Sequence, residues 1–348
     1  MSVTTEITRI QQAKADICTA IQFRGGSDVS SSLLSDNTFK NAINNLEGTL
    51  HYNPRTGNYI SYNGDFYAKL CEYPLWFWSK YSFSLILSDS SNLTAKTFLY
   101  TTTTTADAYE QPDLTGKTWS TMTLGTAISV PANTFICIKS ESTVPVSNTS
   151  SYRRFTIRDN NYHEVWCGGN IQSLMNFSTT LPSNATFQYL FNQTNNATSL
   201  KSAPLLPYKD LSNRNKIYQH MFHDCKALEY PPILPATVLS ESCYEAMFLN
   251  CFSLKWFPDL PASEFKSRCY YNMFGAVKRP YRLKCMTYKN YALVSNPTSN
   301  WLQYTTPYFG FLITPHPEIF STNSPSGIPE NWQAKTTEYN MSQYRNNN

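Results

Sequence analysis

The sequence has few charged residues: Asp, Glu, Lys and Arg fill 15% of its 348 positions, where soluble proteins carry about 25%. The formal net charge is only +4, which is too small to predict a nucleic-acid partner. Disordered chains are poor in aromatic residues, whereas 15% of this chain is Phe, Trp or Tyr. This balance excludes general disorder and favours a folded protein rich in β-structure.

The nine cysteines are spaced neither as metal ligands nor as a disulfide framework. Their number is odd, and no Cys-x-x-Cys motif occurs. This spacing argues against a zinc ribbon and favours reduced cysteines that are buried as small apolar side chains. We therefore predict free thiols, no metal ion and no cofactor.

Long hydrophobic runs are also missing. The most apolar stretch, residues 73–87, is interrupted by Lys80, and a membrane span needs about 18 apolar residues. Glu6 and Arg9 lie where the apolar core of a secretory signal would be. From these features we expect neither a membrane span nor export through a signal peptide.

The first 48 residues carry apolar side chains at the spacing of a helix face. Thr4 or Thr5 can cap the start of this helix, and Gly25-Gly26 ends it. The seam consists of four isoleucines, Ile7, Ile10, Ile17 and Ile21. Two interpretations stay open: the helix packs on its own domain, or it joins a bundle of several chains, because isoleucine seams favour trimers and tetramers. We predict a helical anchor over residues 1–48, with these isoleucines at the oligomerisation or docking contact.

Short alternating runs replace the helical pattern between residues 49 and 165. Six runs are typical of strands: residues 51–52, 58–62, 82–87, 96–100, 126–130 and 134–138. Their regular spacing predicts an antiparallel β-sandwich over residues 49–165. The aromatic-rich stretch of residues 73–78 fits either a ligand-stacking patch or packing in a core or subunit interface, and we favour packing.

A repeat of 26 residues lies in the second half of the chain. Residues 221–246 and 247–272 align without gaps and share ten identities. A third copy opens at Met273-Phe274, and a looser earlier copy begins at Leu190-Phe191. This period is typical of leucine-rich repeats, whose units stack to bury their apolar edges. We predict that the recurring side chains form the repeat core: Met221, Phe222, Cys225, Leu228, Met247, Phe248, Cys251 and Leu254.

The repeat resembles that of BspA-like leucine-rich-repeat proteins, which are common in gut Bacteroidales and in phages that infect them. That family pairs a Met-Phe-x-x-Cys-x-x-Leu segment with a Leu-Pro-Ala-x-x-Leu segment and a later Cys-Tyr. Both full copies show this pattern, with Phe265 in place of the last Leu in the second copy. The resemblance covers roughly residues 110–335. It implies a short leucine-rich-repeat solenoid with a C-terminal cap over residues 166–348, so that the expected fold is mainly β with some α.

The N-terminus is similar to the opening of many phage tail and fibre proteins. This likeness rests on residues 5–10, which read Thr-Glu-Ile-Thr-Arg-Ile, followed by Ala13, Lys14 and Ile17. It implies a virion protein that assembles in the host cytoplasm and is released by lysis. We expect a fibre or appendage subunit on the head or tail, for example of a crAss-like phage. Its expected partners are further copies of itself, most simply in a homotrimer, capsid or tail proteins, and a polysaccharide or protein of the host surface.

No recognisable catalytic motif occurs. His220-x-x-His223, followed by Asp224, imitates a metal site, but the second copy carries Leu249 and Asn250 at the equivalent places. We therefore interpret these residues as surface and core. Among the 24 acidic residues, no two can be identified from the sequence as the pair of catalytic carboxylates of a glycosidase. We predict no enzyme and no catalytic residues, and two alternatives stay open: a bacterial BspA-like surface adhesin and, less favoured, a polysaccharide depolymerase.

Overall fold

The computed structural model describes residues 50–53, 58–61, 73–90, 93–104, 112–159, 161, 163–193, 199–212, 214–278, 282–303, 310–320 and 327–336. The chain divides into two compact units, one of Met1–Ala68 with Glu338–Asn348 and one of Lys69–Thr337. The division into residues 1–48, 49–165 and 166–348 stays a prediction. The helical anchor and its isoleucines, Ile7, Ile10, Ile17 and Ile21, lie outside the described residues.

In the first unit, the described residues form one antiparallel hairpin. Strand β1 (Leu50–Asn53) pairs with β2 (Asn58–Ser61), so that Leu50 lies opposite Ser61 and Asn53 opposite Asn58. Two of the predicted strand runs, residues 51–52 and 58–62, fall on this hairpin.

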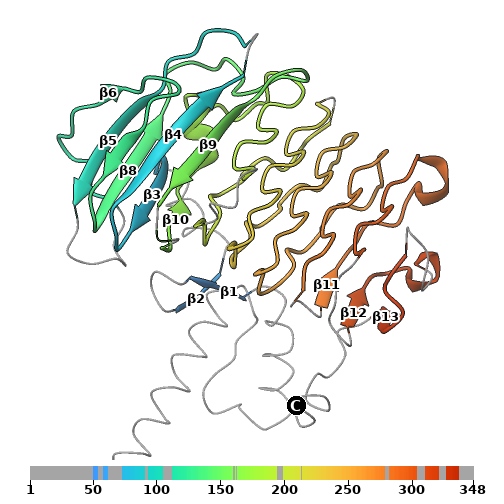
Figure 1. Ribbon diagram of the computed structural model, residues 1–348. Coiled ribbons are helices and arrows are strands. Elements are labelled where there is room, and N and C mark those ends of the chain that lie inside the picture. The colour runs from blue at the N-terminus through green and yellow to red at the C-terminus, as the bar shows by residue number, and fades with distance from the viewer. Residues whose placement is uncertain are drawn as a thin grey trace, which may run out of the picture. The chain divides into compact units, whose positions relative to one another are not determined.

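Two antiparallel sheets open the second unit (Figure 1). One has the strand order β10-β3-β8-β5-β6, and the other has the order β7-β4-β9. The strands are β3 (Leu75–Ser79), β4 (Phe83–Asp89), β5 (Leu99–Thr104), β6 (Ser120–Thr121), β7 (Ile128–Val130), β8 (Thr134–Lys139), β9 (Arg153–Arg158) and β10 (Trp166–Gly168). The four remaining runs predicted from alternation overlap β4, β5, β7 and β8, the run 96–100 only through its last two residues.

The two faces of the five-stranded sheet carry different clusters, because alternate side chains of a strand point to opposite faces. Leu75 and Phe77 of β3 join the main hydrophobic core, where the ring of Phe77 lies 5.2 Å from that of Phe155 on β9. Trp76 and Trp78 join a second, smaller cluster with Phe135 and Cys137. The main core therefore packs one sheet against the other, and the second cluster lies on the outer face.

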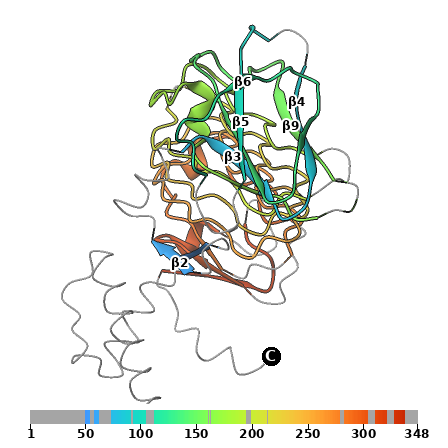
Figure 2. The ribbon, with the colours of Figure 1, turned by 90° about the vertical axis from the view of Figure 1, so that its left-hand side faces the viewer.

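From residue 185 to residue 303, the described backbone consists mainly of turns, and we call this region the turn stack. Alternate N–H groups of one copy donate to carbonyl oxygens of the next copy: Tyr218 to Cys243 at 3.0 Å, Phe222 to Met247 at 3.0 Å and Phe248 to Met273 at 2.9 Å. Successive copies therefore lie in register, and equivalent side chains form rows along the stack. The sheets lie at one end of this stack (Figure 1), and the view from the side of the sheets shows the stack behind them (Figure 2).

Residues in the left-handed conformation explain why these segments form turns and not helices or strands. Positive φ recurs every fourth residue at non-glycine positions: Lys216, His220 and Asp224 in one row, Ser242, Ala246 and Asn250 in the next, and Arg268, Asn272 and Ala276 in the third. Side chains disfavour this conformation. A helix needs consecutive right-handed residues and a strand needs extended ones. A left-handed residue at every fourth position therefore interrupts both.

The predicted fold class is wrong. Strands account for 27% of the structure and helices for 5%, and no described helix reaches seven residues. No leucine-rich-repeat solenoid is present within the described ranges. Isolated parallel bridges, such as Ser202 with Tyr230 and Asp210 with Val238, lie where such a solenoid would have strands of several residues. The antiparallel sheets are small and do not close. No helix in the described part is long and apolar enough to cross a membrane.

A parallel sheet follows the turn stack at the end opposite the first two sheets (Figure 1). It has the order β11-β12-β13 and consists of β11 (Arg282–Lys284), β12 (Gly310–Ile313) and β13 (Trp332–Lys335). The described helices are three short 3-10 helices, η2 (Ile171–Met175), η3 (Tyr291–Leu293) and η4 (Pro317–Ile319).

A column of phenylalanine rings runs through the core of the second unit. Phe155 of β9 stacks on Phe191 at 5.7 Å, and Phe191 stacks on Phe222 at 5.2 Å. Phe222, Phe248 and Phe274 continue the column with centroid separations of 5.7 and 5.6 Å and interplanar angles of 1° and 2°. The sheets and the turn stack therefore share one continuous core.

Candidate binding surface

The residues predicted to form the repeat core are all buried. Each exposes at most 1% of its surface: Met221, Phe222, Cys225, Leu228, Met247, Phe248, Cys251 and Leu254. The thiol of Cys225 donates to the carbonyl oxygen of Phe191 at 3.0 Å, and that of Cys251 donates to the carbonyl oxygen of Phe222 at 3.1 Å. These side chains hold neighbouring copies together and are not accessible to a ligand.

Free thiols are confirmed for the seven cysteines within the described ranges, all of which are buried. They are Cys137, Cys167, Cys225, Cys243, Cys251, Cys269 and Cys285. Burial raises the pKa of the Cys243 and Cys285 thiols to about 12. A reactive thiol needs a lowered pKa and access to solvent, so these two do not have the properties of nucleophiles.

A row of rings lies on the outer side of the turn stack, and we call it the histidine row: Tyr152, Tyr189, His220 and His223. Ring centroids lie 4.8 Å apart for Tyr152 and Tyr189, and 4.8 Å apart for Tyr189 and His220, whose planes differ by 4°. His220 and His223 are 5.2 Å apart. The register of the stack produces this alignment. The backbone N–H of Tyr189 donates to the carbonyl oxygen of Gln219, and the backbone N–H of His220 donates to the carbonyl oxygen of Glu245.

An ion pair lies beside the histidine row. Arg268 donates two hydrogen bonds to Glu245, at 3.1 and 2.7 Å, and its guanidinium lies 4.0 Å from the ring centroid of Tyr271. Burial acts to raise the pKa of Glu245, but the hydrogen bonds from Arg268 and Ser242 outweigh it and hold this pKa below its usual value. Glu245 is therefore an ionised partner of Arg268 at neutral pH and not a proton donor.

Burial, together with the neighbouring His223, lowers the pKa of His220 to about 4. An efficient general base has a pKa near the working pH, so His220 is poorly suited to that role at pH 7. The Nδ1 atom of His220 is buried without a hydrogen-bond partner. The histidine row thus offers neutral stacked rings, which suit non-covalent contact better than proton transfer.

The motif of His220, His223 and Asp224 does not form a metal cluster. His223 Nε2 lies 3.4 Å from Asp224, while the adjacent Cys225 turns into the core. Across the described ranges, no group of three or more His, Cys, Asp and Glu side chains could hold a metal ion.

A second group of aromatic side chains was missed from the sequence, and we call it the aromatic band: Trp119, Trp166 and Trp256, which are half-buried, and Tyr230, which is buried. Trp119 and Trp166 pack against the outer cluster of the five-stranded sheet. Trp166 continues to Tyr230 at 5.6 Å, and Tyr230 to Trp256 at 5.4 Å. Tyr230 and Trp256 occupy the same place in the two repeat copies. This shared aromatic position was the available sequence signal.

Gly168 lets the edge of the five-stranded sheet accommodate a large ring beside this band. A Cβ atom at Gly168 would lie 2.0 Å from the indole ring of Trp76. Glycine therefore allows the Trp76 ring to lie directly on β10, next to the strand position from which Trp166 projects.

Lysines and glutamates accompany the aromatic band. Lys201 Nζ lies 3.2 Å from Glu164 and 2.7 Å from Glu229. Lys255 Nζ lies 2.7 Å from Glu229 and donates to the hydroxyl of Tyr230 at 2.7 Å. These charges cancel in pairs along the row, so that the rings lie beside polar groups without a large local excess of charge.

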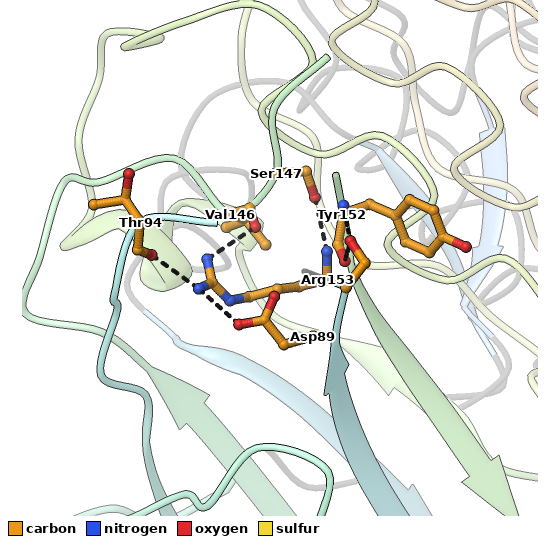
Figure 3. Close-up of polar contacts among 7 residues, drawn as sticks. Asp89, Thr94, Val146, Ser147, Tyr152 and Arg153 are labelled. Carbon is orange, nitrogen blue, oxygen red and sulfur yellow. Dashed lines mark hydrogen bonds and ion pairs between the residues drawn. The ribbon is translucent and has the colours of Figure 1, made fainter. Parts of the chain in front are cut away.

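Two buried cations at the end of the sheets have a structural role, and Figure 3 shows the contacts of one of them, Arg153. Arg153, 1% exposed, donates to Asp89 at 3.1 Å and to the carbonyl oxygens of Thr94 and Val146 at 2.9 and 3.2 Å. Lys96 donates to the carbonyl oxygens of residues 142 and 144 at 2.6 and 2.7 Å. Loop carbonyl oxygens accept hydrogen bonds from both cations, and Asp89 accepts a further one from Arg153, so the two side chains join loops.

The Asp89→Asn variant is expected to lower the free energy of unfolding by about 1.5–3 kcal/mol, because the buried Arg153 loses its ionised partner and keeps only a neutral amide acceptor. Urea unfolding measures this loss. Glu141→Gln is the control, since the pair of Glu141 with Lys139 is largely exposed and is worth less than about 1 kcal/mol. Equal losses in the two variants would contradict the structural role of the Asp89–Arg153 pair.

Comparison with known proteins adds no relative. No family model matches this chain, and neither a curated protein nor a solved structure is significantly similar to it.

Proposed function

We propose that this chain is a structural subunit of a phage particle, a fibre or appendage protein on the head or tail that contacts the host surface. The observation that carries the proposal is the register of the turn stack, in which Phe222, Phe248 and Phe274 superpose ring on ring. A stack of this kind repeats the same outer positions along one direction. It is a scaffold for multiple weak contacts with a repetitive partner.

The chemistry of the described side chains supports a non-enzymatic role. The repeated cysteines are buried, His220 has a low pKa, and Glu245 is held by Arg268. A catalytic site usually needs a base or nucleophile whose pKa matches its task. The residues that could have served as catalytic or metal-binding groups instead pack in the core, as the cysteines do, or form part of the histidine row.

The location and the partners follow from the sequence resemblance. The opening Thr5-Glu6-Ile7 and the Met-Phe-x-x-Cys repeat are similar to segments of phage fibre and BspA-like proteins. We propose a homotrimer joined through Ile7, Ile10, Ile17 and Ile21, bound to capsid or tail proteins of the virion. The outer rows of the turn stack would then be presented to the host surface.

Mass spectrometry and immunogold microscopy of purified phage particles test this function. We expect peptides of the chain at an abundance comparable with other minor structural proteins, and gold label at one defined place on the head or tail. A matched preparation of uninfected host cells is the control. If the chain were missing from particles but labelled on the surface of the bacteria, the bacterial adhesin would be the better explanation.

A further inference from the structure

We propose that His220 is an acid-sensitive switch in the turn stack: when its ring takes up a proton, the ring leaves the histidine row and the neighbouring segments of the stack separate there. This inference goes beyond the proposed function, because it concerns how the fold responds to pH. The first observation is the place of His220 in the repeat. One and two repeats later, the equivalent positions hold Ala246 and Asn272, which carry no ionisable group. An ionisable ring is therefore present at this position in one segment and not in the next two.

The second observation is the surroundings of the His220 ring. It stacks on Tyr189 with centroids 4.8 Å apart and lies 5.2 Å from the ring of His223. Its Nδ1 atom is buried and has no hydrogen-bond partner among the described residues. A neutral imidazole can leave this nitrogen unprotonated, whereas an imidazolium carries N–H groups on both nitrogens. Because a buried donor without an acceptor is costly, the protonated ring is more stable when it is turned out toward water.

The charged side chains that face His220 do not offset this cost. Burial is the largest cause that lowers its pKa to about 4, and the neighbouring His223 and the charge of Arg268 act in the same direction. The charges of Glu245 and Asp224 oppose them, but Glu245 is already held by two hydrogen bonds from Arg268, at 3.1 and 2.7 Å. Burial also lowers the pKa of His223, against the charge of Asp224. In the closed stack both rings are therefore neutral at pH 7.

The pH range of the switch follows from the two states of His220. In the open stack the ring is solvated, and its pKa returns to about 6.5, the usual value for histidine. Between about pH 6.5 and 4 the open state therefore binds a proton that the closed state does not, and the closed state loses stability as the pH falls. The equilibrium constant for opening rises by up to about tenfold per pH unit in this range. The pKa of Glu245 is held below 4.5 in the closed stack, so the contribution of Glu245 is lost only at lower pH.

Hydrogen exchange of the full chain, followed by mass spectrometry at pH 7, 6 and 5, tests this proposal. Residues 216–224 report the opening, because the backbone N–H groups of Tyr218, His220 and Phe222 donate to the following repeat. With the pH dependence of intrinsic exchange divided out, we expect the protection of this segment to fall about twentyfold from pH 7 to pH 5. Residues 268–276 contain no histidine and should keep their protection over the same range.

His220→Asn and His220→Ala are the matched variants, since Asn272 and Ala246 adopt positive φ, 53° and 50°, as His220 does at 54°. Both variants are expected to keep the fold at pH 7 and to remove the pH dependence of residues 216–224. His316→Asn is the control, because His316 lies outside the turn stack and its side chain is 42% exposed. This variant should respond to pH as the original chain does.

Three results would overturn the proposal: unchanged protection of residues 216–224 at pH 5, an equal loss in residues 268–276, or a loss in the His220 variants as large as in the original chain. Circular dichroism at pH 7 shows whether each variant folds, and if one does not, the other reports. The comparison of the two segments within the original chain needs neither variant.

Discussion

The protein is expected to unfold steeply as the pH rises from about 8.5 to 10. Burial raises the pKa of six thiols, those of Cys167, Cys225, Cys243, Cys251, Cys269 and Cys285. Such thiols stay protonated in the folded chain, while in the unfolded chain they ionise near pH 8.5. The unfolded state then binds fewer protons, so stability is lost as the pH rises above that value.

The expected size of this effect is unusual because equivalent cysteines recur along the stack. Each thiol lowers the free energy of unfolding by about 1.4 kcal/mol per pH unit once the unfolded thiol is ionised. Six thiols together give about 8 kcal/mol per unit, which is comparable with the whole stability of an ordinary domain. Urea unfolding at a series of pH values under reducing conditions measures the slope.

A double variant of Cys225→Ala and Cys251→Ala is the matched comparison. It removes two of the six thiols, and the alkaline slope should fall by about one third. Lys96 works in the opposite direction: burial, together with the charge of Arg153, lowers its pKa to about 8. The unfolded state holds the Lys96 proton between pH 8 and 10.5, so this residue alone would add stability as the pH rises. An unchanged slope in the double variant would show that the thiols are not the cause.

The sequence predicted the strands better than the repeats. Alternation identified β4, β5, β7 and β8 because these strands bury one face or both. The alignment of the two full copies also matched Phe222 with Phe248, and the structure stacks these rings. Burial periodicity is local information, and it is what a single sequence carries most reliably.

The backbone of the repeats could not be predicted in the same way. Lys216, Ser242 and Arg268 adopt positive φ at equivalent positions, yet none is a residue type that favours the left-handed region. The register between copies, through hydrogen bonds such as that of Ser242 to Ser267, accompanies this conformation. Tertiary contacts therefore override local preference, and a consensus of buried residues alone suggested the wrong architecture.

The contacts within the histidine row and the aromatic band could not be predicted from the sequence either. His220 and His223 could be singled out from the sequence, but the pKa of His220 depends on burial and on His223 and Glu245, and its ring stacks on Tyr189, which lies 31 positions earlier in the chain. Trp166 lies outside the repeat and meets Tyr230 because residue Val165, before β10, bridges to Leu200, and the nearby Ser202 bridges to Tyr230. Contacts between such distant positions are set by the fold and leave no local pattern.

The Phe248→Ala variant is expected to lose about 3–5 kcal/mol of unfolding free energy. Phe248 is fully buried and lies between Phe222 and Phe274, at 5.7 and 5.6 Å. Truncation therefore removes two stacked contacts and leaves a cavity in the middle of the column. Because the neighbouring rings are held by the backbone register, they cannot close the gap without breaking hydrogen bonds such as that of Phe248 to Met273.

Phe252→Ala and Phe248→Leu separate ring stacking from general apolar packing. Phe252 is half-buried in the same copy, where truncation is expected to cost about 1 kcal/mol. Phe248→Leu retains much of the volume and should cost less than alanine, because most of the cavity is filled. Urea unfolding of the three variants should therefore rank them, with Phe248→Ala the least stable. If Phe248→Ala were as mild as Phe252→Ala, the phenylalanine column could not be the element that joins the copies, and the backbone ladder would have to hold the stack alone.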